Sequence, residues 1–149
     1  MEKSLPIEPL KSFDNYHDSL TNHFAAPVFY DALKREVSFA KREGNQVAVI
    51  KFQLPENATT DHLLYFANEL ELTVRHHDLI ARLAEREFAV LLRFDFDITS
   101  ACEALITRLK NVEKREFFYA FALSDGTKDV ANLLEELDNP HILIAAHAI

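Results

Sequence analysis

An arginine and an aspartate, Arg75 and Asp78, lie three residues apart directly after a stretch with helical periodicity. This spacing at a helix end puts both side chains on one side of the chain. The planar guanidinium offers two parallel N–H donors and the carboxylate accepts N–H groups, so together they could bind the edge of a planar polar ligand. The same residues could equally form a solvated ion pair, which contributes less than about 1 kcal/mol to stability.

Other residue types that carry chemistry give weaker signals. His76 and His77 are adjacent and therefore do not form the i, i+4 pair that binds a metal on a helix. A single cysteine, Cys102, excludes an internal disulfide and is expected to be a buried structural thiol. We find no Ser–His–Asp or Cys–His arrangement with a distinguishing local context. The sequence predicts no metal site and no cofactor.

Composition limits the classes of function. The chain has 149 residues, 48% of them hydrophobic, which suits one compact domain. Its two glycines, Gly44 and Gly126, are too few for a glycine-rich phosphate loop. A net charge of −8 argues against a nucleic-acid partner. Without a signal core or a long apolar run, we expect a cytoplasmic protein that does not insert directly into a membrane.

The positions of apolar residues predict the secondary structure. Residues 1–12 are expected to be a flexible leader, and 13–149 a single domain. Apolar residues at steps of three and four predict helices at 27–42, 60–75, 98–111 and 128–137. Apolar and β-branched runs predict strands at 46–54, 78–83, 88–94, 116–123 and 142–149, with residues 84–87 closing a hairpin. This order predicts an α/β (α+β) sandwich with a mixed central sheet of about five strands flanked by helices.

Two stretches carry a resemblance to a known family. Residues 17–21 (HDSLT) and 29–33 (FYDAL) resemble the D-x-L-T…F…L opening of GGDEF domains, the diguanylate cyclases. Residues 75–92 (RHHDLIARLAEREFAVLL) resemble the R-x-x-D-x-x-x-R-x-G-G-D-E-F-x-x-x-L core of that family, without a gap. The resemblance covers about residues 17–138 and implies a GGDEF, nucleotide-cyclase-like fold.

The signature itself departs from the family pattern. It is degenerate and consists of Ala84, Glu85, Arg86, Glu87 and Phe88. In the family, the two glycines let the backbone approach GTP, and the next acid and a strand-end aspartate bind a divalent metal. Here Arg86 and Gln53 stand at the two metal positions, and neither a guanidinium nor a neutral amide replaces a carboxylate. We therefore expect no cyclase activity.

The segments that bind the substrate in the family are also altered. Residues 55–61 are shorter than the family's guanine-reading segment, and only Asp61 corresponds to its last acid. Residues 139–149 contain no lysine or arginine, whereas the family's corresponding segment brings basic residues to the phosphates. These differences add to the expectation that GTP is not a substrate.

The resemblance implies a specific ligand for Arg75 and Asp78. In GGDEF domains, the R-x-x-D before the signature is the inhibitory site for the product, cyclic di-GMP. Arg75 could donate to guanine O6 and N7, and Asp78 could accept from guanine N1–H and N2–H. His76 or Arg82 could stack on a base or contact a phosphate.

Two functions remain open at this point. The first is a catalytically inactive GGDEF-like domain that acts as a cyclic di-GMP sensor or effector through Arg75 and Asp78. The alternative is a module of the same fold that binds no nucleotide and mediates contact with a protein partner or a homodimer. The exposure of Arg75 and Asp78 distinguishes them, since a ligand site requires side chains that face a cavity rather than each other.

Overall fold

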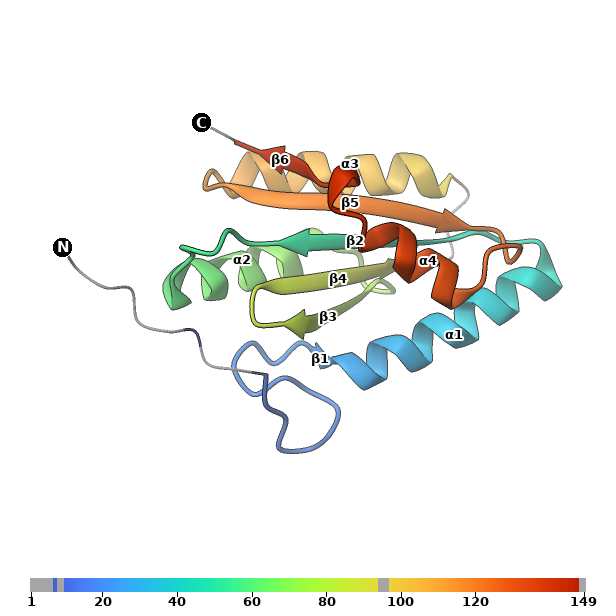
Figure 1. The fold of residues 1–149 in the computed structure, drawn as a ribbon, viewed down its shortest axis with the longest axis horizontal. Coiled ribbons are helices and arrows are strands. Elements are labelled where there is room, and N and C mark those ends of the chain that lie inside the picture. Colours follow the sequence, from blue (N-terminus) through green and yellow to red (C-terminus); the bar gives the residue numbers. More distant parts are fainter. Residues whose placement is uncertain (1–6, 8–9, 94–96, 148–149) are drawn as a thin grey trace.

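The computed structural model describes residue 7, residues 10–93 and residues 97–147. Six strands form one mixed sheet in the order β1-β3-β4-β2-β5-β6 (Figure 1). The strands are β1 (Phe24–Ala25), β2 (Val47–Gln53), β3 (Leu79–Ala84), β4 (Glu87–Leu92), β5 (Phe117–Ser124) and β6 (Ile144–Ala146). The helices are α1 (Ala26–Glu43), α2 (Thr60–Thr73), α3 (Ile98–Val112) and α4 (Val130–Leu137), followed by the 3-10 turn η1 (Pro140–Ile142).

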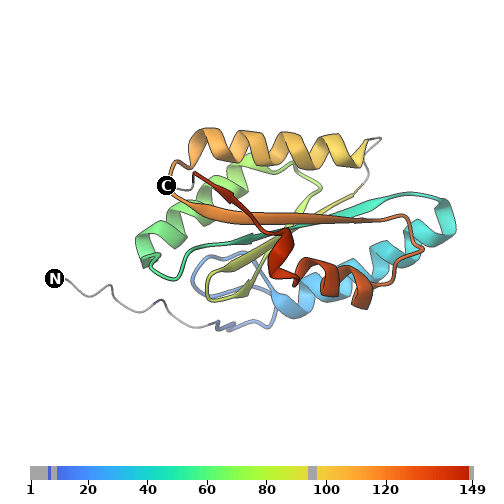
Figure 2. The same ribbon diagram turned by 45° about the horizontal axis from the view of Figure 1, so that its top comes forward.

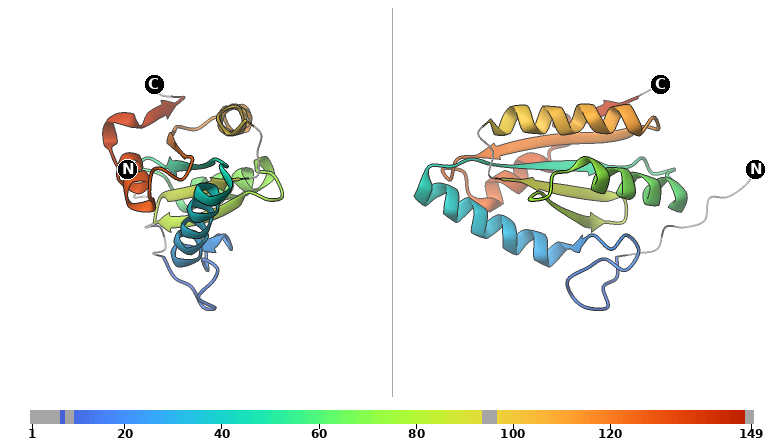
Figure 3. Two further views of the ribbon diagram at one scale, coloured as in Figure 1. Left: turned by 90° about the vertical axis from the view of Figure 1, so that its right-hand side faces the viewer. Right: turned by 180° about the vertical axis from the view of Figure 1, so that it is seen from behind.

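The helices cover both faces of the sheet, α2 and α3 on one side and α1 and α4 on the other (Figure 3). The alternation of strand β2 explains this arrangement. Ile50 and Phe52 belong to the core under α2 and α3, while Val47 and Val49 belong to the core under α1 and α4. Because β2 is buried on both faces, nearly all of its residues are apolar, which explains the continuous apolar run in the sequence.

Four phenylalanines fix helix α2 against the sheet. The ring of Phe66 on α2 lies 5.7 Å from Phe52, 5.5 Å from Phe88 and 5.3 Å from Phe117, centroid to centroid. Aromatic pairs of this kind add about 0.5–1.5 kcal/mol each beyond the burial of their area. This cluster anchors the middle of α2 to the sheet.

The predicted fold class is confirmed, with differences at the edges. Strand β1 was not predicted, so the sheet has six strands rather than about five. The last predicted strand, 142–149, is wrong in extent: η1 takes up Ile142, and a positive φ of 59° at His147 ends β6. Residues 94, 148 and 149 of the predicted strands lie outside the described residues. Helix α4 begins two residues late because Asp129 caps it, accepting from the N–H of Asn132.

The loop before β1 lies along the edge of the sheet that β1 forms beside β3 (Figure 2). Tyr16 O accepts from Ala25 N at 2.7 Å, and Lys11 O accepts from Ser19 N at 2.7 Å. Ile7 is buried against the core under α2 and α3. The rest of the proposed leader up to residue 9 lies outside the described residues. Of the helices described, none has the length and apolar character needed to cross a membrane.

Candidate nucleotide-binding site

The R-x-x-D segment forms a tight turn between α2 and β3. After Thr73 the chain becomes extended at Val74, with φ −73° and ψ 159°. Asp78 N then donates to Arg75 O at 3.0 Å, and Asp78 Oδ2 accepts from Arg75 N at 3.0 Å. The aspartate therefore stabilises the backbone of the turn with its side chain, as Asx residues do in turns.

The two side chains of this motif face each other. Arg75 Nη2 donates to Asp78 Oδ1 at 3.2 Å, and Arg75 Nε donates to Oδ2 at 3.3 Å. The Arg75 side chain is 34% exposed, and the Asp78 side chain is fully buried. A base could reach the Asp78 carboxylate only if this ion pair opened.

Two further arginines reach the same turn. Arg93 donates through Nε to His77 O at 3.1 Å and through Nη1 to Glu36 Oε1 at 2.8 Å. Arg108, on α3, donates to Thr73 O at 3.1 Å. A carbonyl has no formal charge, so the contact of Arg108 with it leaves a positive charge beside the turn. His76 is exposed there.

Arg82 has a structural role instead of the predicted ligand contact. Its side chain is fully buried and donates to both carboxylate oxygens of Asp18, at 3.2 and 3.3 Å. It also donates through Nε and Nη2 to Glu85 O, at 3.3 and 2.9 Å. The expectation that Arg82 meets a base or a phosphate is therefore wrong, because its donors hold the loop before β1 and the signature hairpin.

The signature forms the tip of the β3–β4 hairpin, as predicted. Ala84 pairs with Glu87, and Glu85 and Arg86 make the turn. The glycine-free turn is accommodated by a register shift between Arg82 and Ala84. Phe88 is fully buried in the aromatic core.

The hairpin tip does not fit a divalent metal. Arg86 pairs with Glu85, Nη1 to Oε2, at 3.5 Å, and Gln53 lies opposite Glu87 in the sheet. A guanidinium and an amide at these positions cannot supply the carboxylate oxygens that Mg²⁺ prefers. Within residues 10–93 and 97–147, no three His, Cys, Asp or Glu side chains come together in a way that could hold a metal ion. Asp61, the remaining candidate guanine reader, is exposed in the first turn of α2.

An ion cluster that the sequence analysis missed lies on the α1 and α4 side. Lys51 Nζ is 3.6 Å from Glu87 Oε1 and 3.4 Å from Asp138 Oδ1. The cluster borders a cavity of about 110 Å³ that Tyr30 also lines. Burial raises the pKa of Glu87, and the Lys51 ammonium opposes this rise. The sequence feature that could have revealed this cluster was Lys51, a lysine inside an otherwise apolar strand.

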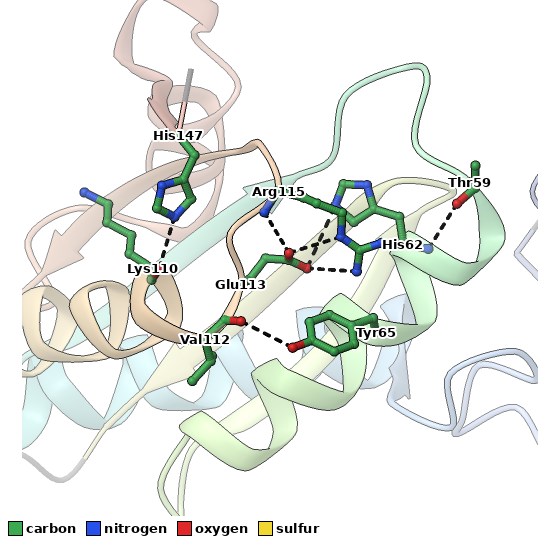
Figure 4. A network of polar contacts seen from close by, with 8 residues as sticks. All are labelled: Thr59, His62, Tyr65, Lys110, Val112, Glu113, Arg115 and His147. Atoms are coloured by element: carbon green, nitrogen blue, oxygen red, sulfur yellow. Dashed lines mark hydrogen bonds and ion pairs between the residues drawn. The ribbon is translucent and has the colours of Figure 1, made fainter. Parts of the chain in front are cut away.

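A second missed network joins α2 to the segment between α3 and β5 (Figure 4). Glu113, 1% exposed, accepts from Arg115 Nε at 3.2 Å and Nη2 at 3.4 Å. His62 Nε2 lies 3.9 Å from Glu113 Oε2, and the Arg115 guanidinium lies over the Tyr65 ring. Burial and the Arg115 charge lower the pKa of His62, and Glu113 acts in the opposite direction. Nothing in the sequence pattern indicated this pairing.

No protein-family model matches the sequence, and no curated protein sequence matches it. Solved structures do match the fold. The GGDEF domain of TpbB (YfiN) from Pseudomonas aeruginosa is 24% identical, with a TM-score of 0.70 over 83% of this chain and 84% of that one. The GGDEF domain of DgcB from Caulobacter crescentus, solved with c-di-GMP, is 16% identical, with a TM-score of 0.74 over 86% and 88%.

A third similar structure is the diguanylate cyclase SiaD from Pseudomonas aeruginosa, solved with its activator SiaC. It is 14% identical, with a TM-score of 0.71 over 82% of this chain and 55% of that one. The TM-scores of 0.70 to 0.74 over more than four fifths of this chain show that these structures share its fold. The chain therefore has the fold of GGDEF domains.

Proposed function

We propose that this chain is a GGDEF-like domain without cyclase activity that acts through contact with protein and needs no bound nucleotide. The observation that carries the proposal is the closed pair of Arg75 and Asp78. Asp78 has no exposed side-chain surface, and both of its oxygens accept from Arg75. Opening this pair for a ligand would leave a buried carboxylate without its charged partner, at a cost of several kcal/mol by analogy with buried pairs.

The proposed lack of catalysis rests on the hairpin tip and its neighbours. Arg86 and Gln53 offer no carboxylate to a metal, and the Lys51 ammonium already lies between Glu87 and Asp138. Phosphoryl transfer depends on metal ions and basic groups that neutralise phosphate charge. The similar structure of SiaD with its activator supports the other half of the proposal, because it is a protein of this fold in a protein complex.

The test is a calorimetric titration of the purified chain with cyclic di-GMP and, separately, with GTP and Mg²⁺. We expect no heat of binding for either ligand up to high micromolar concentration. Saturable binding of cyclic di-GMP would overturn the proposal.

A second candidate function is a cyclic di-GMP sensor at the same turn. Arg108 favours this function: Arg75 and Arg93 are paired with acidic side chains, but Arg108 contacts a neutral carbonyl, and its positive charge beside the turn attracts an anionic ligand in spite of the net charge. The similar domain of DgcB was solved with c-di-GMP.

If the titration shows binding, variants locate the site. Arg75→Ala should then weaken binding about 10- to 100-fold, since a bidentate arginine–guanine contact is worth about 1–3 kcal/mol. Arg75→Lys should weaken binding nearly as much, because an ammonium lacks the two parallel N–H donors of the planar guanidinium. Arg35→Ala is the matched control, because Arg35 is exposed on α1 and paired with Asp31.

A further inference from the structure

The two edges of the sheet differ in how they are protected. At one edge, the loop before β1 lies against β1, with an antiparallel bridge between His17 and Phe24. The His17 ring also stacks on Phe24 at 5.2 Å. At the other edge, β6 is the last strand of the sheet, and among the described residues no strand pairs with its outer side.

The β6 edge lacks the side chains that usually block edge pairing. Residues 139–149 contain no Asp, Glu, Lys or Arg. Ile144 is 51% exposed and Ala145 is exposed. Leu143 is also extended, with φ −67° and ψ 129°, so four residues present backbone in strand geometry. Natural edge strands commonly carry charges or proline against association, and an edge without them is a template for another strand.

We propose that this edge pairs with β6 of a second copy of the chain, antiparallel, about a two-fold axis at Ala145. This inference rests on the proposed interaction function and names its partner and surface. An antiparallel edge is complementary to itself, as an isologous interface requires.

The side chains of β6 fit such self-pairing. In the register centred on Ala145, Ile144 of each copy lies opposite Ala146 of the other, so that a large exposed side chain meets a small one. Both residues lie on the face of the sheet that bears α2 and α3, where Ala146 pairs with Phe117 and Ile144 with Tyr119. The two copies would form one continuous twelve-stranded sheet.

Charge favours this edge over other surfaces for self-association. Each copy has a net charge of −8, so most approaches bring acidic groups together. The uncharged segment from Asn139 onward avoids that repulsion. Since only four residues per copy pair, we expect a reversible dimer in the micromolar range, as for small interfaces.

The first experiment is sedimentation equilibrium of the full chain from low to high micromolar concentration. The unchanged protein should dimerise, and Ile144→Lys should shift the dissociation constant upward at least about tenfold, because two ammonium groups are added at the edge. Leu72→Lys is the matched control: Leu72 is 73% exposed on α2, and this variant should dimerise normally.

The second experiment uses Ala145→Cys under mild oxidation. Directly opposed residues of antiparallel strands have Cβ atoms about 4.5–5.5 Å apart, close enough for a disulfide after small adjustment. We expect a covalent dimer, and none from Leu72→Cys. The native Cys102 is buried.

The outcomes separate this inference from the proposed function. The edge pairing is overturned if the protein stays monomeric at every concentration. It is also overturned if the protein dimerises but Ile144→Lys leaves the dissociation constant unchanged and Ala145→Cys forms no disulfide between copies. Neither result bears on nucleotide binding, which the cyclic di-GMP titration decides. If the edge instead pairs with a strand of another protein, this chain alone would be monomeric and would form a heterodimer with that protein. This outcome would also contradict pairing with a second copy.

Discussion

Arg82 and Asp18 form a buried ion pair across 64 residues of chain, with the Arg82 side chain fully buried and the Asp18 side chain 2% exposed. Asp18 also accepts from Thr21 N and Oγ1, both at 2.9 Å, so its carboxylate organises the loop before β1. Arg82 in turn holds the carbonyl of Glu85. One pair of charges therefore connects the N-terminal loop, the sheet edge and the signature hairpin.

Asp18→Ala should destabilise the fold by about 3–5 kcal/mol, because removing one partner leaves a buried charge uncompensated. Urea denaturation measures this loss. Asp31→Ala, which removes an exposed pair with Arg35 on α1, should cost less than about 1 kcal/mol. An Asp18→Ala variant as stable as Asp31→Ala would show that the pair does not stabilise the loop.

Gly126→Ala should cost about 2–4 kcal/mol, since it combines a strained backbone with a steric clash. Gly126 has φ +97°, and an added Cβ would overlap Lys41 Cα, in the backbone of α1. Gly44→Ala is the control: its φ is +70° but its surroundings are open, so we expect a loss of about 1–2 kcal/mol from the backbone alone. Thermal denaturation of both variants compares the two effects, and equal losses would contradict the predicted contact with α1.

Stability should fall as the pH drops below 6.5, the ordinary pKa of histidine. Burial lowers the pKa of His23 and of His62, so the folded state favours their neutral forms. Between the folded and unfolded pKa values the unfolded chain binds more protons, so stability is greatest above pH 6.5 and declines toward the folded pKa. Each histidine contributes at most about 1.4 kcal/mol per pH unit.

Urea denaturation of His23→Gln and His62→Gln at a series of pH values checks this slope. Each substitution should flatten the dependence of unfolding free energy on pH just below 6.5. His141→Gln, at an exposed position, should leave the slope unchanged. A slope that persists in the double variant His23→Gln, His62→Gln would assign it to other groups.

Arg86→Asp should not produce cyclase activity. The substitution restores one carboxylate at the hairpin tip, but Gln53 stays neutral and residues 139–149 provide no lysine or arginine for phosphates. The measurement is chromatographic detection of cyclic di-GMP after incubation with GTP and Mg²⁺. Product above a blank without enzyme, from the variant or from the unchanged chain, would refute the proposed inactivity.

Local patterns predicted most of the elements. The helix that became α1 was visible in its apolar spacing and in Gly44, which has the positive φ of a helix C-terminus. The hairpin was located by the register of the signature residues, although its turn contains no glycine. Strand β1 escaped prediction because two residues, Phe24 and Ala25, are too few to show a periodicity, and their partners on β3, Ala81 and Arg82, lie far away in the sequence.

The sequence predicted where the site lies, but it did not predict that Arg75 and Asp78 form an ion pair with each other. The spacing placed Arg75 and Asp78 on the same side of the chain, as the structure shows. That they bind each other depends on the burial of Asp78 by packing, which a three-residue motif does not contain. Arg82 looked like a ligand contact for the same reason, since its partner Asp18 lies far away in the sequence.

The cluster of Lys51, Glu87 and Asp138 also limits how the chain could evolve. A lysine at position 138 would place a second ammonium beside Lys51, whose Nζ is 3.4 Å from the present Asp138 carboxylate. Losing Lys51 alone would leave two carboxylates facing each other over a small cavity. Either substitution alone therefore passes through a less stable protein, so the ion cluster opposes the change of this surface into a basic, phosphate-binding one.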